Sequence, residues 1–120
     1  MKSDIEVSVV IPAYNNEKTI DACLKSVLLQ SVAPAEIIVV DDGSTDSTVQ
    51  RAAAYAGVKV IQLECNVGVQ AARNVGINAA PSDWIAFLDA DDVWMLDNLL
   101  YKKDIFTILA KEKFITHVLL

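Results

Sequence analysis

Four short apolar runs constrain the fold of this chain more than any other feature. They are VSVVI (7–11), EIIVV (36–40), VKVIQL (58–63) and DWIAFL (83–88). The runs are rich in Val and Ile, and they are continuous rather than alternating. This pattern is typical of strands in a parallel sheet that is covered on both faces. The runs therefore predict four buried strands with covering elements between them.

Helical patterns separate the four runs. They are expected over about 19–30, from a cap at 44–46 to Gly57, over about 69–80, and over about 97–113. The inward stripes predicted for the first three are Ile20, Cys23, Leu24, Val27 and Leu28; Val49, Ala52, Ala53 and Ala56; and Val69, Ala72, Gly76 and Ala79. Alternation of strand and helix at this spacing predicts right-handed βαβ units. The expected fold class is α/β, a three-layer α/β/α arrangement around a mostly parallel sheet.

Length and charge limit the class of protein. At 120 residues, 53% of them hydrophobic, the chain is one small domain (1–120) or a piece of a larger one, with a real core. A formal net charge of −6 argues against a nucleic-acid partner, which would need a basic surface. No apolar run reaches the length of a membrane span, and the start MKSDIEVS does not resemble a signal peptide. We expect a cytoplasmic protein, in solution or at the inner face of the membrane.

The cysteines and the histidine favour structural roles. Cys23 falls on core spacing, and Cys65 lies alone near an expected loop. No CxxC or Cys/His set indicates zinc, and a disulfide is not expected in a reducing compartment. His117, the only histidine, lies in an apolar tail, where a structural role is favoured over catalysis.

The last stretch, KFITHVLL (113–120), has the pattern of a further strand. Nothing follows it to cover its far side. Either the domain continues elsewhere, or the strand pairs with another chain across an exposed edge and forms a homo-oligomer. The sequence leaves both interpretations open.

Polar residues collect where the predicted strands end. Ligands of open parallel sheets bind at the carboxyl ends of the strands, which share one edge of the sheet. The residues found there are Pro12, Ala13, Tyr14, Asn15, Asn16 and Glu17; Asp41, Asp42, Gly43 and Ser44; Asn66, Val67 and Gly68, leading to Arg73; and Asp89, Ala90, Asp91 and Asp92. This convergence indicates a binding site more strongly than any one of these motifs.

Two of these groups also have structural interpretations. Asp41 to Ser44 could form an ordinary turn and helix cap, and Pro12 to Asn15 could simply end a strand. Arg73 falls at the margin of an apolar helix stripe, where a guanidinium usually needs an anionic partner. That partner is either Asp41 or Asp42, or a bound ligand.

The run FLDADDVW (87–94) places three carboxylates, Asp89, Asp91 and Asp92, within four positions. Carboxylates at i and i+2 can converge on one hard cation, and Mg²⁺ usually keeps coordination positions for phosphate oxygens. A capping role is the alternative. The chain has neither a G-x-x-x-x-G-K-[ST] motif nor a G-x-G-x-x-G motif after the first strand. A metal, rather than a glycine-rich loop, would therefore hold phosphates here.

With these segments in order, the chain resembles the N-terminal part of the GT-A glycosyltransferases, specifically the large inverting family 2. The matching pieces cover roughly residues 6–100: VSVVIPAYNNEKTIDACLKSVLLQ, EIIVVDDGSTDST, NVGVQAARNVGI and DWIAFLDADD. The resemblance implies a GT-A fold and a nucleotide-diphosphate sugar donor, with a UDP-sugar favoured. It also implies Mn²⁺ or Mg²⁺, and inverting transfer to an unidentified acceptor in cell-surface polysaccharide or glycoconjugate synthesis.

The resemblance also implies residue roles. Pro12, Ala13, Tyr14 and Asp41 resemble the pocket for the base, with Asp41 accepting a hydrogen bond from the uracil ring N–H. Arg73 resembles the arginine that closes over base and phosphates. Asp89, Ala90 and Asp91 resemble the DxD element, in which Asp89 lies toward the ribose and Asp89 and Asp91 bind the metal. Glu17 and Asp42 match further nucleotide-site acids. The family's general base normally lies beyond the position of Leu120, so no catalytic base is expected in this chain.

Two other function classes are alternatives. One is a non-catalytic nucleotide-sensing or assembly module. The other is a phospho-accepting receiver domain, which would need its acidic pair after the first strand and a lysine after the last. Here Asp41 and Asp42 follow the second strand, which disfavours a receiver domain.

Overall fold

The structure, a computed structural model, describes residues 5–103 and 118–119. Its elements are β1 (Val7–Ala13), α1 (Ile20–Leu28), β2 (Glu36–Asp41), α2 (Thr48–Ala53), β3 (Val58–Gln62), α3 (Val69–Ala79), β4 (Trp84–Phe87) and β5 (Val118–Leu119). Residues 98–103 are also helical. The strands form one sheet in the order β3-β2-β1-β4-β5, and every pairing is parallel. The predicted parallel α/β sheet is confirmed.

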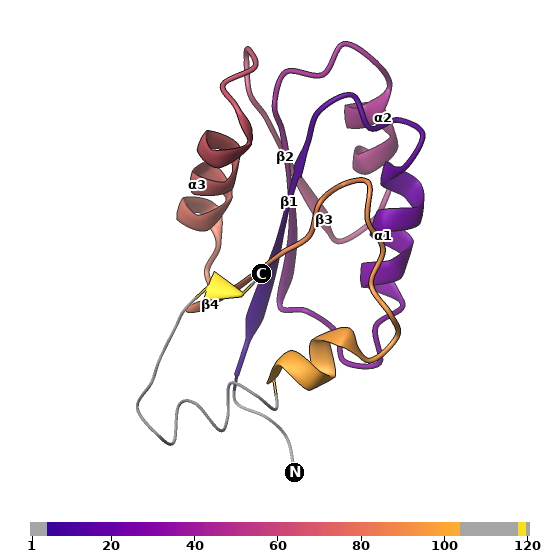
Figure 1. Cartoon of the computed structure of the whole chain (residues 1–120), viewed down its shortest axis with the longest axis vertical. Helices are drawn as coiled ribbons and strands as arrows, with labels where there is room; N and C mark the ends of the chain where they lie inside the picture. The colour runs from indigo at the N-terminus through magenta and orange to yellow at the C-terminus, as the bar shows by residue number, and fades with distance from the viewer. Residues whose placement is uncertain (1–4, 104–117, 120) are drawn as a thin grey trace.

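Helices cover both faces of the sheet. In Figure 1, α1 and α2 lie on one side of the strands and α3 lies on the other. Successive side chains of a strand point to opposite faces, so β1 contributes to two cores. Val9 and Ile11 pack in the cluster that includes α1, whereas Val10 packs with Ala72 of α3. The three-layer α/β/α architecture is therefore confirmed.

The strand order places a topological switch point between β1 and β4. From β1 the chain adds β2 and then β3 in one direction, and β4 then pairs with the other edge of β1. Ligands of open α/β sheets bind outside the carboxyl ends of the strands at such a point. Signalling receivers have the order 2-1-3-4-5 instead, so the receiver-domain alternative is wrong.

Several predicted elements differ in burial from the expectation. In α1, Ile20, Cys23, Leu24 and Val27 are buried as predicted, but Leu28 is 44% exposed. The third strand was expected to be buried, but β3 lies at the edge of the sheet and is only half-buried. The second helix ends at Ala53, and Ala53 and Ala56 are exposed. Ala52 is buried as predicted, and the other inward residues are Thr48 and then Tyr55, which packs against the core and donates a hydrogen bond to Asp21. That contact sets the rotation of the helix.

The third helix also differs from its predicted stripe at one end. Ala72 and Gly76 are buried as expected, but Val69 is 52% exposed. Gly76 packs directly on Val10 of β1, and a methyl group there would collide with the Val10 side chain. This close approach at Gly76 brings the helix onto the sheet, and its first residue, Val69, stays at the edge.

Of the elements predicted near the C-terminus, the structure describes only a part. The predicted fourth helix is helical over 98–103, and residues 104–113 lie outside the described part. Of the predicted last strand, Val118–Leu119 pairs with β4, while His117 and Leu120 are not among the described residues. An incomplete domain and a homo-oligomer both stay predictions. Within the described ranges, no helix is long and apolar enough to cross a membrane.

Candidate functional site

A hollow of about 180 Å³ lies at the switch point between β1 and β4. We call it the switch-point hollow. Its lining residues come from the carboxyl ends of β1, β2 and β4 and from the first turn of α3: Pro12, Ala13, Tyr14, Asn16, Asp42, Val69, Ala72, Asp89, Ala90 and Asp91. Of the ten residues predicted for the nucleotide and metal sites, all but Glu17, Asp41 and Arg73 line this hollow. Asn16 was expected among the residues at the strand ends but was given no role, and Val69 and Ala72 were expected only as inward residues of a helix.

Side chains after β1 hold Tyr14 at the edge of the hollow. Asn15 has a positive φ of 51°, and its Oδ1 accepts a hydrogen bond from the Thr45 N–H at 2.8 Å. The Asn15 N–H donates to Ser44 Oγ, also at 2.8 Å. Asn16 Oδ1 accepts from the Tyr14 N–H. The β1–α1 loop is thus fastened to the β2–α2 loop, which leaves Tyr14 half-exposed beside the hollow.

Glu17 joins the same two loops. Its Oε2 accepts a hydrogen bond from the Ser47 N–H at 3.1 Å, and its own N–H donates to Asp46 Oδ2 at 3.2 Å. Asp46 also accepts from the Thr48 N–H, which satisfies one free donor at the start of α2 as the predicted cap would. Among the described residues, the role of Glu17 is therefore to hold the β1–α1 loop against the β2–α2 loop.

The neighbouring acids Asp41 and Asp42 have different environments. Both oxygens of Asp42 accept backbone hydrogen bonds, from the Val67 N–H at 2.8 Å and the Gly68 N–H at 3.0 Å, which hold the residues before α3. Asp41 is fully buried; its Oδ2 accepts from the Ser44 N–H, and its Oδ1 has no partner among the described residues. Of the two, Asp42 lines the switch-point hollow.

Gly43 explains how these loops approach so closely. Its φ is +82°, and a Cβ there would lie 2.8 Å from the backbone of Cys65 and Asn66. A side chain would therefore separate the β2–α2 loop from the β3–α3 loop. Only glycine permits both the conformation and the contact.

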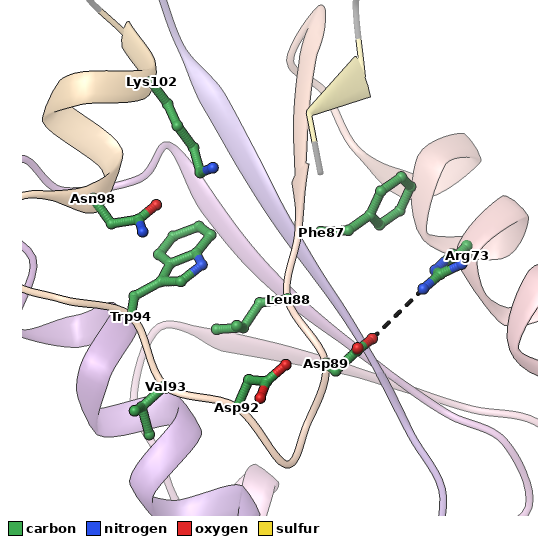
Figure 2. A pocket seen from close by; sticks show the side chains of 9 residues that line it. All are labelled: Arg73, Phe87, Leu88, Asp89, Asp92, Val93, Trp94, Asn98 and Lys102. Atoms are coloured by element: carbon green, nitrogen blue, oxygen red, sulfur yellow. Dashed lines mark ion pairs between the residues drawn. The ribbon is translucent and has the colours of Figure 1, made fainter.

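Arg73 projects from α3 toward the loop after β4. Its Nη2 lies 3.5 Å from Asp89 Oδ1, and its guanidinium lies 5.6 Å from the centre of the Phe87 ring (Figure 2). The Nε atom is buried without a partner among the described residues. The structural alternative that paired Arg73 with Asp41 or Asp42 was wrong, because the acid that it reaches is Asp89. This ion pair is half-exposed, so it contributes little to stability.

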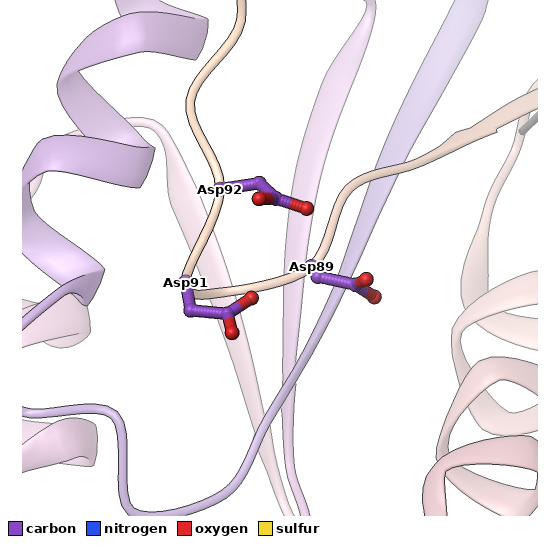
Figure 3. A group of neighbouring side chains, drawn as sticks. All are labelled: Asp89, Asp91 and Asp92. Atoms are coloured by element: carbon purple, nitrogen blue, oxygen red, sulfur yellow. The ribbon is translucent and has the colours of Figure 1, made fainter.

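The three acids of residues 89–92, the acidic loop, converge. Asp89, Asp91 and Asp92 are exposed, and one carboxylate oxygen from each lies within 4.8 Å of the other two (Figure 3). The Asp92 N–H donates to the Asp89 carbonyl at 3.0 Å, which closes a tight turn. Asp92 was not among the predicted metal ligands, although its position in the run of three acids could have indicated it as one. Like charges this close repel unless a cation joins them.

The electrostatic effect of the acidic loop extends to α1. Cys23 is buried, and its thiol lies 3.6 Å from the Asp89 carbonyl, to which it donates. Burial, together with the negative charges of Asp92, Asp91 and Asp89, raises the pKa of the Cys23 thiol to about 12. The thiol therefore stays protonated. Cys23 and the exposed Cys65 are both free, as the sequence predicted.

A second pocket, of about 360 Å³, shares Asp89 with the switch-point hollow. We call it the side pocket. Figure 2 shows its lining: Arg73, Phe87, Leu88, Asp89, Asp92, Val93, Trp94, Asn98 and Lys102. The residues after Asp92 were missed by the sequence analysis, because an apolar segment followed by a helix has no motif for a pocket. Aromatic, amide and charged groups together suit a polyhydroxylated ligand.

The chain is similar to known glycosyltransferases in sequence and in fold. The profile of "Glycosyl transferase family 2" matches residues 8–102. UDP-Glc:alpha-D-GlcNAc-diphosphoundecaprenol beta-1,3-glucosyltransferase WfgD of Escherichia coli is 39% identical over 98 residues, covering 80% of this chain and 39% of that protein. TarS of S. aureus in complex with UDP superposes with a TM-score of 0.78 at 35% identity, covering 91% of this chain and 33% of that one.

A third similar protein was crystallised with a metal. It is glucosyl-3-phosphoglycerate synthase from Mycobacterium tuberculosis, in complex with Mn²⁺, UDP and glucosyl-3-phosphoglycerate. Its TM-score is 0.63 at 33% identity, covering 72% of this chain and 34% of that one. This chain therefore spans between a third and two fifths of WfgD, of the 1–349 fragment of TarS and of the M. tuberculosis chain, and a fifth of the longer TarS chain.

Proposed function

Because the chain belongs to glycosyl transferase family 2, we propose that it binds a nucleotide-diphosphate sugar, with a UDP-sugar favoured, for inverting transfer of the sugar. The observation that carries this proposal is the meeting of the switch-point hollow, the acidic loop and Arg73 at Asp89. The names of similar proteins support the donor class. WfgD is named for UDP-Glc, and TarS was crystallised with UDP and with UDP-GlcNAc.

We propose that the base of the nucleotide occupies the switch-point hollow. Ala13, Val69 and Ala72 give the hollow apolar walls, and the half-exposed Tyr14 adds an aromatic face, which suits a flat ring. Asp41 is proposed to accept from the uracil N3–H through Oδ1, the oxygen that has no partner among the described residues. A buried carboxylate oxygen is normally hydrogen-bonded, so a donor supplied by the ligand would stabilise Oδ1, which supports this role.

The acidic loop is proposed to hold Mn²⁺ or Mg²⁺ through Asp89 and Asp91, with Asp92 as a third acid within reach. Clustered carboxylate oxygens fit such hard cations. The Mn²⁺ and UDP in the M. tuberculosis crystal support this assignment. A bound divalent ion would offset the charge of the diphosphate and make it a better leaving group.

Arg73 is proposed to contact the diphosphate. Its guanidinium presents several N–H donors in a planar fork that matches phosphate oxygens. In the described structure it engages only Asp89 among acids, at the long distance of 3.5 Å. The Phe87 ring orients it toward the acidic loop. The side pocket, which shares Asp89 with the switch-point hollow, is proposed to receive the sugar.

Calorimetry with UDP tests the donor and metal together. We expect UDP to bind well in Mn²⁺ or Mg²⁺ and poorly in EDTA, because without a cation the acidic loop repels the diphosphate. We also expect UDP to bind more tightly than CDP, since cytosine places an acceptor opposite Asp41. Equal UDP affinity in EDTA and in Mn²⁺ would refute the metal assignment.

Two matched variants test which acid faces the base. Asp41→Asn should narrow the preference for UDP over CDP, because an amide can offer either a donor or an acceptor. Asp42→Asn should keep the preference for UDP over CDP, because both Asp42 oxygens already accept hydrogen bonds from the Val67 and Gly68 N–H groups. The reverse result would assign the base contact to Asp42, which lines the hollow.

We also propose a domain organisation, a cellular location and an acceptor class. Residues 1–120 are proposed to act as one nucleotide-sugar-binding unit in the cytoplasm, and the acceptor to belong to cell-surface polysaccharide or glycoconjugate synthesis. The lipid-linked sugar in the name of WfgD supports that acceptor class. A nucleotide-binding or assembly module without catalysis is the alternative, and acceptor-dependent turnover would exclude it.

A further inference from the structure

One side of α1 and the residues after it hold the chain that follows β4. Ser26 Oγ accepts a hydrogen bond from the Trp94 N–H at 3.0 Å. Gln30 Nε2 donates to the Met95 carbonyl at 2.6 Å, and Gln30 Oε1 accepts from the Leu99 N–H at 2.9 Å. Ser26 lies in the last turn of α1 and Gln30 lies two residues after its end, and both hold the segment that follows the acidic loop.

The amide of Gln30 is fully used and nearly inaccessible. The residue is 8% exposed, and besides its bonds to Met95 and Leu99 its Nε2 donates to the Ser26 carbonyl at 3.1 Å. Ser26 Oγ in turn donates to the Cys23 carbonyl at 2.7 Å. A buried glutamine with such partners costs free energy to replace, because each lost bond leaves a backbone group unpaired. Neither Ser26 nor Gln30 lines the switch-point hollow or the side pocket.

The acidic loop is therefore held at both ends. Before it, the Leu88 N–H donates to the Val10 carbonyl of β1 at 3.1 Å. After it, the segment 94–99 is held by Ser26 and Gln30. Between these points, three exposed carboxylates repel one another, and repulsion would open a loop that had only one fixed end.

We propose that Ser26 and Gln30 are positioning residues that keep the carboxylates of the acidic loop close enough to share one divalent cation. This inference rests on the proposed metal site. Neither side chain needs to touch the cation, since both act through the backbone of 94–99. Groups that orient metal ligands typically change metal affinity by about 10–100-fold when they are replaced.

Gln30→Glu is the sharpest test. It preserves the shape of the side chain and the acceptor for the Leu99 N–H, but it turns a carboxylate oxygen toward the carbonyls of Ser26 and Met95. Mn²⁺ affinity, measured by electron paramagnetic resonance of the free ion in a titration without nucleotide, should fall at least about 10-fold. UDP affinity in EDTA should not change. Gln50→Glu, at an exposed position of α2, adds the same charge and should leave both quantities unchanged.

Ser26→Ala provides a second variant if Gln30→Glu folds poorly. It leaves the Trp94 N–H without its acceptor, so Mn²⁺ should bind more weakly than to the wild type. Ser26→Thr retains the hydroxyl and should bind Mn²⁺ as tightly as the wild type. A role in stability alone would lower the melting temperature of Gln30→Glu or Ser26→Ala with unchanged Mn²⁺ affinity, and that result overturns the inference.

The titration also separates this inference from the proposed function. If the wild-type chain binds no Mn²⁺, both the metal site and the positioning role are refuted. If it binds Mn²⁺ but not UDP, the proposed function fails while the positioning role is still decided by the variants. If it binds both and Gln30→Glu matches it, only the positioning role is wrong.

Discussion

Asp89, Asp91 and Asp92 are exposed in a chain that already carries a net charge of −6. At the scale of single residues, such a group lowers stability unless something positive joins it. Arg73 reaches only Asp89, at 3.5 Å. Asp91 and Asp92 are thus the acids whose charge is least compensated by the described neighbours, which is the electrostatic reason to expect a cation here.

Asp91→Asn separates the metal role from a structural one. It removes one charge from the acidic loop, so metal-dependent UDP binding should weaken by about 10–100-fold, or roughly 1.4–2.8 kcal/mol. The same change relieves repulsion, so the melting temperature without metal should hold or rise. Calorimetry and a thermal melt measure the two effects. Asp83→Asn, an exposed acid before β4, is the control and should alter neither. A melting temperature that falls with unchanged binding would make Asp91 a structural residue.

At the scale of elements, Gly76 sets how closely α3 approaches the sheet. A methyl group there meets the Val10 side chain, so Gly76→Ala should destabilise the fold by about 1–3 kcal/mol, against a helix-propensity gain of about 1 kcal/mol. Urea unfolding measures the difference. Asn78→Ala, at an exposed position of the same helix, should be neutral or stabilising. Val10→Ala should partly rescue Gly76→Ala in a double-mutant cycle; simple additivity would show that the two residues do not press on each other.

The contact between α1 and α2 predicts a pH dependence. The hydroxyl of Tyr55 donates to Asp21 at 2.7 Å, and this bond, with the Arg51 guanidinium, lowers the pKa of Asp21; the same bond raises the pKa of Tyr55. Because the pKa of Asp21 is lowered in the fold, the ionised carboxylate stabilises the fold above about pH 4, and this stabilisation is lost as the pH falls below that value. Because the pKa of Tyr55 is raised, the protonated hydroxyl stabilises the fold below about pH 10, and this stabilisation is lost at higher pH.

Tyr55→Phe should therefore be less stable than wild type between about pH 5 and pH 9, with the deficit shrinking toward both extremes. Urea unfolding across pH 3–11 follows it. Tyr101→Phe changes an exposed tyrosine in the same way and serves as the control. A deficit of Tyr55→Phe that is independent of pH would assign the loss to packing of the ring.

At the scale of the whole molecule, we expect donor binding without useful transfer by these 120 residues. A general base must lie within hydrogen-bond reach of the acceptor hydroxyl. Among the described residues near the site, Asp42 and Glu17 accept backbone hydrogen bonds, and the acidic loop is proposed to bind metal. UDP release with Mn²⁺, a UDP-sugar and broad acceptor mixtures should stay below about 1 s⁻¹. Faster acceptor-dependent release would show a complete catalytic site.

The sequence by itself determined the architecture and the place of the site. Continuous Val and Ile runs such as 36–40 specify buried parallel strands, and residues that follow such strands must share one edge of the sheet. For that reason the sequence alone predicts that Pro12, Asp89 and Asp91 lie together, and all three line the switch-point hollow. These properties are local, since they depend on residues a few positions apart.

Only the tertiary structure decided which groups pair across the molecule. The Arg73–Asp89 pair, the two different environments of Asp41 and Asp42, and the bond from Gln30 to a backbone 65 residues away depend on how helices rotate and settle on the sheet. Rotation of α2 was mispredicted because a small alanine-rich helix has several apolar faces, and the contact of Tyr55 selects one of them. Periodicity identifies a face that can be buried, but packing against distant residues decides which face is buried.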